Sequence, residues 1–241
     1  MTVMQSCAAT IALAFALANA ALAGNFQVSP VRLELSANAT SAALTVRNEG
    51  SEAVVVQMTV LKWTQGDNAD RYDATTEALV TPPIATIPAG GEQLVRVGLR
   101  RAPDIRNELA YRLYVQEVPP PPQPGFSGLN VALRVGIPVF VASRVPAERA
   151  VDWSAKLDPA GALTITARNR GTVNLQVRSI GADAPDAGAT WGTDNALTYV
   201  LPGNERSWTL PPASPGARRP PSIAVKAATD AGDVDTRIAL P

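Results

Sequence analysis

Residues 44–51 read LTVRNEGS, and residues 163–172 read LTITARNRGT in the second half of the chain. In each stretch, apolar and polar side chains alternate until Arg-Asn-x-Gly is reached, followed by Ser or Thr. Alternation with a period of two is typical of a strand with one buried face, and Asn and Gly tolerate the left-handed backbone of tight turns. An apolar segment containing Gln57 or Gln176 follows each stretch. The shared order of strand, hairpin turn and strand predicts two related β-domains.

The rest of the chain continues this pattern on both sides. Further candidate strands cover residues 28–35, 54–61, 92–99, 111–118 and 129–141, and clusters of Pro and Gly separate them. No convincing amphipathic helix is present, and a short helical turn is expected only over residues 103–109. Short strands at turn-separated intervals in halves of about 100–125 residues are typical of immunoglobulin-like sandwiches. The sequence therefore predicts an all-β protein with two immunoglobulin-like β-sandwich domains, over residues 24–145 and 146–241.

The first 23 residues have the pattern of an export signal. An apolar run rich in Ala and Leu covers residues 8–23 and ends in the small-x-small triplet ALA before Gly24. The run is short for a membrane span, and residues 1–7 lack the Lys or Arg that usually precedes a signal. The alternative is a buried or anchoring N-terminal helix. Cleavage after residue 23 also removes Cys7, which leaves a mature chain without cysteine.

Composition excludes several classes of function. The 241 residues contain no His, one Cys, and 21 basic and 21 acidic residues, so the formal net charge is zero. Ser-His-Asp, Cys-His and H-E-x-x-H sites are therefore absent, and no disulfide can form within the chain. Asp67, Asp70 and Asp73 lack the glycine and the glutamate of a calcium loop. We expect no enzymatic activity, no metal or other cofactor, no nucleic-acid partner and no small-molecule substrate.

Without a disulfide, each domain core is expected to depend on alternating aliphatic residues and on tryptophans. The four tryptophans are Trp63, Trp153, Trp191 and Trp208.

The most unusual segment ends the first half. Residues 119–125 read PPPPQPG, which cannot pair as a strand because proline has no N–H. Strictly alternating aliphatics then occupy Leu129, Val131, Leu133, Val135, Ile137, Val139 and Val141. A strand of about 13 residues is more than twice the usual five to six. Pro138 prevents full pairing on both sides, so part of the strand is expected to be an edge. A long aliphatic edge suits a protein that lends a strand to a partner that lacks one.

These features together resemble the periplasmic chaperones of pilus assembly, the PapD-like family. In the first half the resemblance is carried by VRLEL at residues 31–35, VTPPIATIPAG at 80–90, EQLVRV at 92–97, and ELAYRLYVQEVPP at 108–120, followed by the alternating segment. In the second half it is carried by the repeated strand and turn, by the LPG at 201–203, and by Asp230. The resemblance covers essentially the whole mature chain, and it implies two domains in an L or boomerang arrangement.

The resemblance also implies a mechanism. In the family, the G1 strand of the first domain complements an incomplete pilin by donating alternate aliphatic side chains, which here correspond to Leu129, Val131, Leu133 and Val135. The protein is then expected to bind and stabilise pilus or fimbrial subunits in the periplasm and to deliver them to an outer-membrane usher, without a cofactor.

A basic cleft in the family fixes the terminal carboxylate of the pilin. Its arginine on the first strand corresponds to Arg32, whereas its lysine on the donor strand falls on Pro138. Arg112 on the neighbouring strand is the expected substitute, with Arg134 as a weaker candidate. This departure is similar to the divergent, archaic-type members. A guanidinium that holds the carboxylate sets the register, and a slip of one residue would turn every aliphatic side chain the wrong way.

The family also joins its two domains through charged side chains. Its acidic positions correspond to Glu108 and Asp230, and an arginine after the donor strand lies between them. Strict register places Ala142 there, so Arg144 is expected to take this role.

Two other classes of protein fit parts of the pattern. An exported structural β-sandwich, such as a pilus subunit or adhesin, is expected to carry an N-terminal donor extension, but residues 24–30 are short and contain Pro30. An exported carbohydrate-binding domain is expected to expose an aromatic platform, whereas aromatics make up only 5% of this chain.

Overall fold

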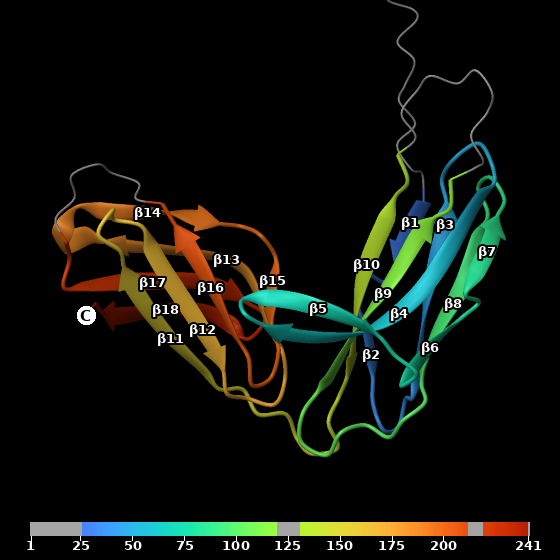
Figure 1. Ribbon diagram of the computed structural model, residues 1–241, viewed down its shortest axis with the longest axis horizontal. Coiled ribbons are helices and arrows are strands. Elements are labelled where there is room, and N and C mark those ends of the chain that lie inside the picture. The colour runs from blue at the N-terminus through green and yellow to red at the C-terminus, as the bar shows by residue number, and fades with distance from the viewer. Residues whose placement is uncertain (1–25, 120–130, 212–218, 241) are drawn as a thin grey trace, which may run out of the picture.

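The structure is a computed structural model that describes residues 26–119, 131–211 and 219–240. The predicted all-β fold is confirmed: two β-sandwiches meet at an angle, like the arms of a V (Figure 1). Within the described residues, the only helical element is the short 3-10 helix η2 (Pro185–Ala187). The expected helical turn over residues 103–109 is absent, because that stretch forms bends and then enters a strand.

The first sandwich packs two antiparallel-rich sheets face to face. One sheet has the order β1 (Phe26–Ser29), β3 (Ser41–Asn48), β8 (Glu92–Leu99), β6 (Ala78–Thr81). The other has the order β2 (Leu33–Leu35), β10 (Arg134–Val141), β9 (Leu109–Glu117), β4 (Val54–Gly66), β5 (Ala69–Ala74), with β7 (Ile84–Ile87) paired to β4. Alternate residues of each strand point inward, as the period of two predicts, and form one apolar core around Val46, Val95 and Leu113.

The second sandwich has the same two-layer construction. Its smaller sheet has the order β11 (Val151–Leu157), β12 (Leu163–Asn169), β16 (Glu205–Leu210). Its larger sheet has the order β14 (Ala189–Asp194), β13 (Leu175–Ala184), β17 (Ser222–Thr229), β18 (Gly232–Ala239), with β15 (Thr198–Val200) paired to β13. A separate apolar core lies between these sheets.

The two Arg-Asn-x-Gly stretches adopt the same local structure, but neither is the predicted hairpin. Each carries the chain from one sheet of its sandwich to the other, from β3 to β4 and from β12 to β13. Asn48 is buried, and its side-chain amide donates to the carbonyls of Glu52, Ile87 and Pro88 at 2.7–3.1 Å while its Oδ1 accepts from the Gly50 N–H. The side chain therefore closes a turn between sheets, where no strand ladder is available to satisfy the backbone.

Asn169 repeats this arrangement in the second sandwich. Its amide donates to the carbonyls of Val173 and Val200 at 2.7 and 2.8 Å, and its Oδ1 accepts from the Gly171 N–H at 2.9 Å. The repeat in the sequence therefore marks a buried polar device that each sandwich uses once.

The tryptophans divide between two environments. Trp191 and Trp208 are buried in the second core, and Trp153 packs against that core. Trp63 was also expected in a domain core, but it belongs to a separate cluster in which its ring meets Tyr199 of the second sandwich at a centroid distance of 5.4 Å. The side chain leaves the first core because it lies on the strand face that is turned toward the second domain.

Candidate functional site

Strand β10 is paired fully on one side and only partly on the other. Every residue from Arg134 to Val141 has a partner on β9, whereas pairing with β2 covers only Val139 to Val141. The chain explains the difference, because β1 pairs with β3 in the opposite sheet before the backbone returns as β2. Among the described residues, residues 134–138 therefore form an open strand edge.

Pro138 lies where this open edge ends. It pairs with Arg112 of β9, and the first β2 pair, between Val139 and Leu33, follows one residue later. Because proline lacks an N–H, it cannot contribute a donor to a ladder on the second side. The expectation that Pro138 leaves part of the strand as an edge agrees with this geometry.

The strand is shorter than the predicted span of residues 129–141. It begins at Arg134, and the last backbone contact before it is the bond from the Glu117 N–H to the Leu133 carbonyl at 2.9 Å. Beyond Glu117 the partner strand runs into Pro119, which has no N–H to extend the ladder. A strand needs a partner as well as an alternating pattern, and the pattern alone does not supply one.

The proposed donor residues have different environments. Leu129 lies outside the described residues, and Val131 is 64% exposed. Leu133 and Val135 are partly buried and pack against the first core, at the margin that the open edge leaves uncovered. The apolar row is therefore continuous with the core yet accessible at its outer end.

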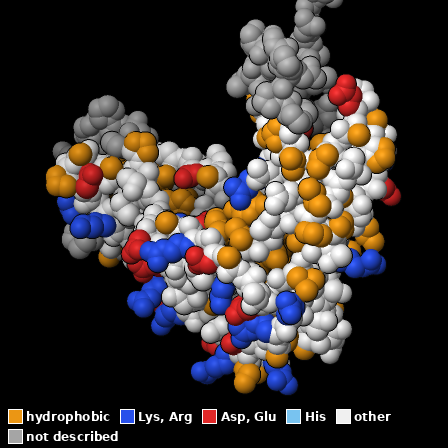
Figure 2. All heavy atoms as spheres, turned by 45° about the vertical axis from the view of Figure 1, so that its right-hand side comes forward, with side chains coloured by type: hydrophobic (Ala, Val, Ile, Leu, Met, Phe, Trp, Pro, Cys, Tyr) orange, Lys and Arg blue, Asp and Glu red, His pale blue; other side chains and the backbone are white. Residues whose placement is uncertain are grey.

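The opposite face of β10 is turned toward the space between the domains. Arg134, Gly136, Pro138 and Phe140 alternate on this face, beside the cross-strand partners of β9. Figure 2 shows a hollow between the two domains, with hydrophobic side chains gathered at its floor and basic side chains beside them. We refer to this surface of β9 and β10 as the cleft face.

Arg112 is fixed on the cleft face by aromatic rings. Its guanidinium carbon lies 4.2 Å from the Trp63 ring centroid and 5.6 Å from that of Tyr72, and Nη2 donates to the Tyr72 hydroxyl at 3.3 Å. Its Nε is buried and has no hydrogen-bond partner. No ion pair joins Arg112 to another described residue. A held guanidinium with an unused buried N–H is suited to binding an anion.

The hydroxyl of Tyr72 reflects the same environment. Burial raises its pKa above the usual value, and the Arg112 charge opposes part of this rise. The phenol therefore stays neutral at physiological pH and keeps its acceptor lone pairs available to Arg112.

Arg32 lies on the same aromatic cluster but is already partnered. Its guanidinium carbon is 4.7 Å from the Phe140 ring centroid, and its Nε contacts Glu34 at 3.0 Å. The Phe140 and Trp63 rings are 5.8 Å apart, so Arg32 and Arg112 stack on neighbouring rings. The structure places the two predicted anchors on one surface without a direct contact between them.

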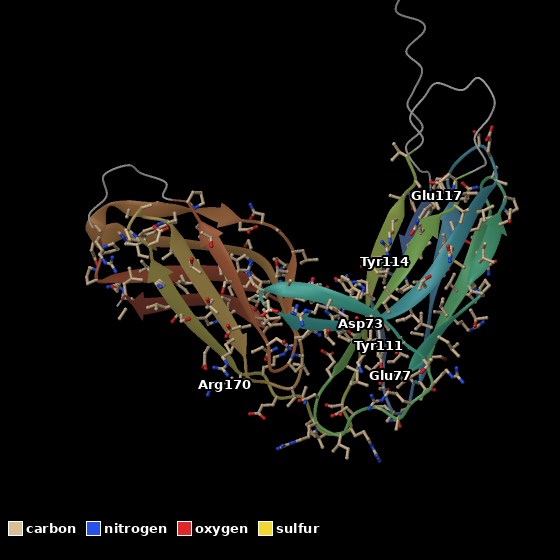
Figure 3. The ribbon with its side chains drawn as sticks, in the orientation of Figure 1. Asp73, Glu77, Tyr111, Tyr114, Glu117 and Arg170 are labelled. Carbon is tan, nitrogen blue, oxygen red and sulfur yellow. The ribbon has the colours of Figure 1, made fainter. Side chains whose placement is uncertain are left out.

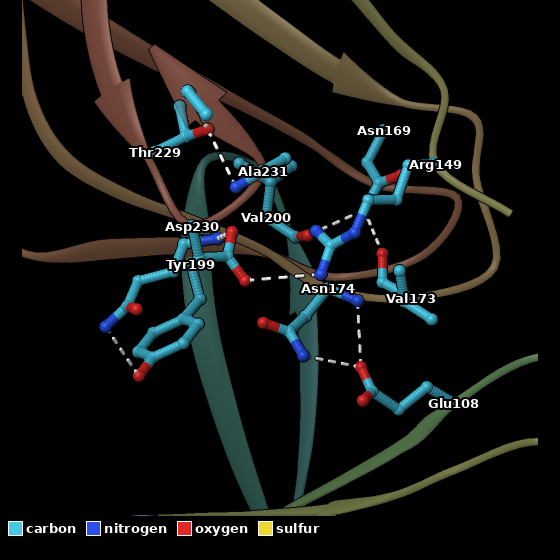
Figure 4. A network of polar contacts seen from close by, with 12 residues as sticks. Glu108, Arg149, Asn169, Val173, Asn174, Tyr199, Val200, Thr229, Asp230 and Ala231 are labelled. Atoms are coloured by element: carbon cyan, nitrogen blue, oxygen red, sulfur yellow. Dashed lines mark hydrogen bonds and ion pairs between the residues drawn. The ribbon is translucent and has the colours of Figure 1, made fainter. Parts of the chain in front are cut away.

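The predicted interdomain residues are in place, with one exception. Glu108 accepts from the backbone and side-chain amides of Asn174 at 2.8 and 2.6 Å (Figure 4). Asp230 accepts from the Gln176 N–H at 2.8 Å and lies 3.6 Å from the guanidinium of Arg149. The choice of Arg144 is wrong: its exposed side chain makes no ion pair with the described residues, and Arg149 contacts Asp230 instead. The linker between the sandwiches carries the chain past Arg144 before it reaches the second domain.

Glu108 is partly shielded from solvent in this junction. Burial raises its pKa above the usual value, although the Asn174 hydrogen bonds and the nearby Arg32 charge oppose the rise. The two acidic residues are therefore joined through backbone and amide groups more than through a shared arginine.

A second bridge between the domains is formed by the β4–β5 hairpin, which extends from the first sandwich (Figure 1). Gln65 donates to the Tyr199 carbonyl and accepts from the Leu201 N–H, both at 2.8 Å. At the hairpin tip, Asn68 bonds both backbone groups of Ser207 at 2.8 and 3.0 Å. The sequence signal that could have predicted this hairpin is Gly66 followed by two turn formers.

Asp70 connects the hairpin to the cleft face. It accepts a hydrogen bond from the Trp63 indole at 3.0 Å and also contacts Arg206 of the second domain. This carboxylate, which does not fit a calcium loop, therefore has a structural role at the junction. No cluster of three potential metal ligands occurs within the described residues. In the same part of the chain, no helix has the length and apolar character needed to cross a membrane.

Comparisons with known proteins identify the class. Residues 25–144 match the family of pili and flagellar-assembly chaperones, PapD N-terminal domain. A CS1 fimbrial protein of Escherichia coli is 28% identical over 163 residues, which cover 64% of this chain and 66% of that protein. The match thus spans just under two thirds of that relative.

Solved structures have the same two-domain fold. A chain of the CsuC–CsuE chaperone–tip adhesion subunit complex from archaic Csu pili of Acinetobacter baumannii has a TM-score of 0.67 at 20% identity, with 90% of this chain and 98% of that chain covered. A chain of the Salmonella enterica SafA pilin complex with the SafB chaperone has a TM-score of 0.60 at 18% identity, with coverages of 90% and 97%. The fold and the open edge define a two-domain β-sandwich chaperone. The chain belongs to the PapD family of pilus-assembly chaperones.

Proposed function

We propose that this protein binds and stabilises pilus or fimbrial subunits through the loan of strand β10, and that it delivers them to an outer-membrane usher. The observation that carries the proposal is the open edge at residues 134–138, which lies beside a guanidinium that has no acidic partner among the described residues. An added strand gains main-chain hydrogen bonds along such an edge, and side-chain contacts then give specificity. This action needs no catalytic group and no cofactor.

Arg112 and Arg32 are the proposed anchors for the terminal carboxylate of the subunit. The free Nε–H of Arg112 lies in the same cross-strand row as Pro138, where the open edge ends. A carboxylate bound there would place the last residue of the subunit at the end of the edge. Leu129, Val131, Leu133 and Val135 would then supply the alternate aliphatic side chains that the subunit lacks.

The remaining parts of the proposal concern processing and type. Residues 1–23 would serve as a signal peptide for export to the periplasm, residues 24–145 as the strand-lending domain and residues 146–241 as the second domain. The family is periplasmic, which supports this location. Replacement of the donor-strand lysine by Pro138 and the fold similarity to the Csu complex both support an archaic-type member.

Strand lending is tested with Val131→Asp, co-expressed with the subunit encoded beside this chain. Val131 is 64% exposed, so the substitution is expected to leave the fold intact and to abolish recovery of soluble subunit. Leu94→Asp is the matched control, because Leu94 is 45% exposed on the other sheet of the same domain. Equal recovery of subunit with Val131→Asp and wild type would rule out strand lending.

The anchor is tested with a synthetic peptide that copies the C-terminal strand of the subunit. Amidation of its terminal carboxylate is expected to weaken binding tenfold or more, as for the loss of a charged hydrogen bond. In Arg32→Ala/Arg112→Ala, acid and amide peptides should bind equally and weakly. Equal binding of the two peptides to wild type would reject the carboxylate cleft.

The double variant should also be somewhat less stable than wild type. Arg112 stacks on Trp63, and loss of such a contact costs about 0.5–2 kcal/mol. The expectation from sequence that the melting temperature stays unchanged is therefore replaced by a small decrease.

A further inference from the structure

A third arginine, Arg134, lies on the cleft face with an aromatic ring beneath it. Its guanidinium carbon is 3.8 Å from the Tyr114 ring centroid, which places the group against the face of the ring. Tyr114 contacts Tyr72 edge-on at 5.8 Å, and Tyr72 lies 6.1 Å from Trp63. One continuous chain of rings therefore supports Arg134 at its outer end and Arg112 further in.

The charge of Arg134 has no acidic partner within the described residues. The neighbouring carboxylate is Glu117, whose Oε2 accepts from the Leu133 N–H at 3.3 Å and forms no ion pair with Arg134. Along β9, Tyr114 lies between Tyr111 near the domain junction and Glu117 near the outer end (Figure 3). Arg134 is exposed and stands at the outer end of the open edge, where a bound strand would pass it.

Gly136 keeps the surface between the two arginines free of side chains. A Cβ at Gly136 would lie 3.1 Å from Cε1 of Tyr114 and 3.5 Å from Cδ of Arg112, so these two side chains lie across β10 at this residue. Arg134 and Pro138 are four residues apart, which corresponds to about 13 Å along a strand. Both point to the cleft face, since alternate residues share a face.

The direction of a bound strand follows from the positions of the anchor and the edge. If its terminal carboxylate lies at the Pro138 row and its backbone pairs with residues 134–138, the strand runs parallel to β10. Its terminal residue then lies beside Pro138, and the residue four positions earlier lies beside Arg134. Because strand side chains alternate, these two residues of the partner point to the same face.

We propose that Arg134 determines specificity through binding of an Asp or Glu side chain four residues before the C-terminus of the subunit. This inference rests on the proposed function, because it takes the register from the terminal anchor. The cleft would thus read two carboxylates at a fixed separation, one on the main chain and one on a side chain. A second fixed point distinguishes the correct register from a slip of two residues, which preserves the face and is not excluded by the aliphatic row.

The test uses the mature full-length chain and eight-residue peptides with a free C-terminus. One peptide carries Glu four residues before its last residue, a second carries Gln there, and a third carries Glu three residues before the last, on the opposite face. The first peptide is expected to bind about threefold to tenfold more tightly than the other two, as for a partly exposed ion pair at an interface. The preference should decrease as salt is raised.

Variants of Arg134 separate this role from general charge attraction. Arg134→Gln is expected to remove the preference for Glu over Gln, Arg134→Lys to retain part of it, and Arg134→Glu to favour a peptide with Lys at that position. Equal binding of the Glu and Gln peptides to wild type, with the amide form still weaker, would overturn the role of Arg134 alone. Absence of binding by all free-acid peptides would overturn the proposed function together with this inference.

Discussion

Substitution of the buried asparagines is expected to destabilise each sandwich to a similar extent. In Asn48→Ala, the two side-chain N–H donors and the acceptor for Gly50 are lost from a site that is 1% exposed. A net loss of about 1 kcal/mol for each of three hydrogen bonds gives about 3 kcal/mol. This is a large part of the roughly 5–15 kcal/mol that stabilises a typical domain.

Asn169→Ala tests the same reasoning in the second sandwich. Its side chain is 2% exposed and also makes two donor bonds and one acceptor bond, so the expected loss is again about 3 kcal/mol. The free energy of unfolding is measured in urea, and hydrogen exchange assigns each loss to its domain. The midpoint should decrease without a change in the urea dependence.

Asn38→Ala provides the control, because Asn38 is exposed and lies in the same sandwich as Asn48. It is expected to change the free energy of unfolding by less than about 0.5 kcal/mol. A loss below this value in either buried variant would refute the view that these side chains stabilise the inter-sheet turns. A loss that spreads equally over both domains in each variant would refute the assignment of one device to each sandwich.

Three further changes probe the domain and its junction. Burial opposes ionisation of Glu77, but hydrogen bonds from Tyr111, Lys62 and Arg101 hold its pKa below the usual value; Glu77→Gln should therefore be less stable than wild type at neutral pH, with the difference shrinking as acid titrates the wild-type carboxylate in urea unfolding. Gly136→Ala should displace the Tyr114 ring, lower the melting temperature by an amount equivalent to about 1 kcal/mol and weaken peptide binding; unchanged stability and binding would contradict the crowding. Asn68→Gly keeps the left-handed backbone of the hairpin tip but removes the bonds to Ser207, so small-angle scattering should show a wider range of interdomain angles; an unchanged profile would argue against the hairpin as a brace.

The sequence predicted the strands best where the alternation was bounded by turn residues. The spans around β3, β8 and β9 agree with the predicted segments within two residues at each end, because an alternating pattern and its turns are both local. The hairpin β4–β5 and the short strands β6 and β7 were missed, since polar or very short segments carry little alternation. The span before Arg134 was predicted as strand because the pattern continues there although its partner strand has ended.

The candidate site shows the same division. Arg32, Arg112, Glu108 and Asp230 were chosen from the resemblance, and the structure places them on the cleft face or at the junction. The aromatic support of Arg112 and the contact of Arg149 with Asp230 depend on segments far apart in the chain, which no local pattern joins.

The sequence by itself determined the fold class, the repeated Asn device and the edge character of the strand that contains Pro138. These features follow from local chemistry, namely side-chain period, turn preference and a missing N–H. Only the tertiary structure decided how much of that edge is open, because β1 joins the opposite sheet and leaves residues 134–138 uncovered. It also decided that Arg112 and Arg134 stand on one aromatic surface, since strand pairing aligns side chains that the sequence separates by more than twenty residues.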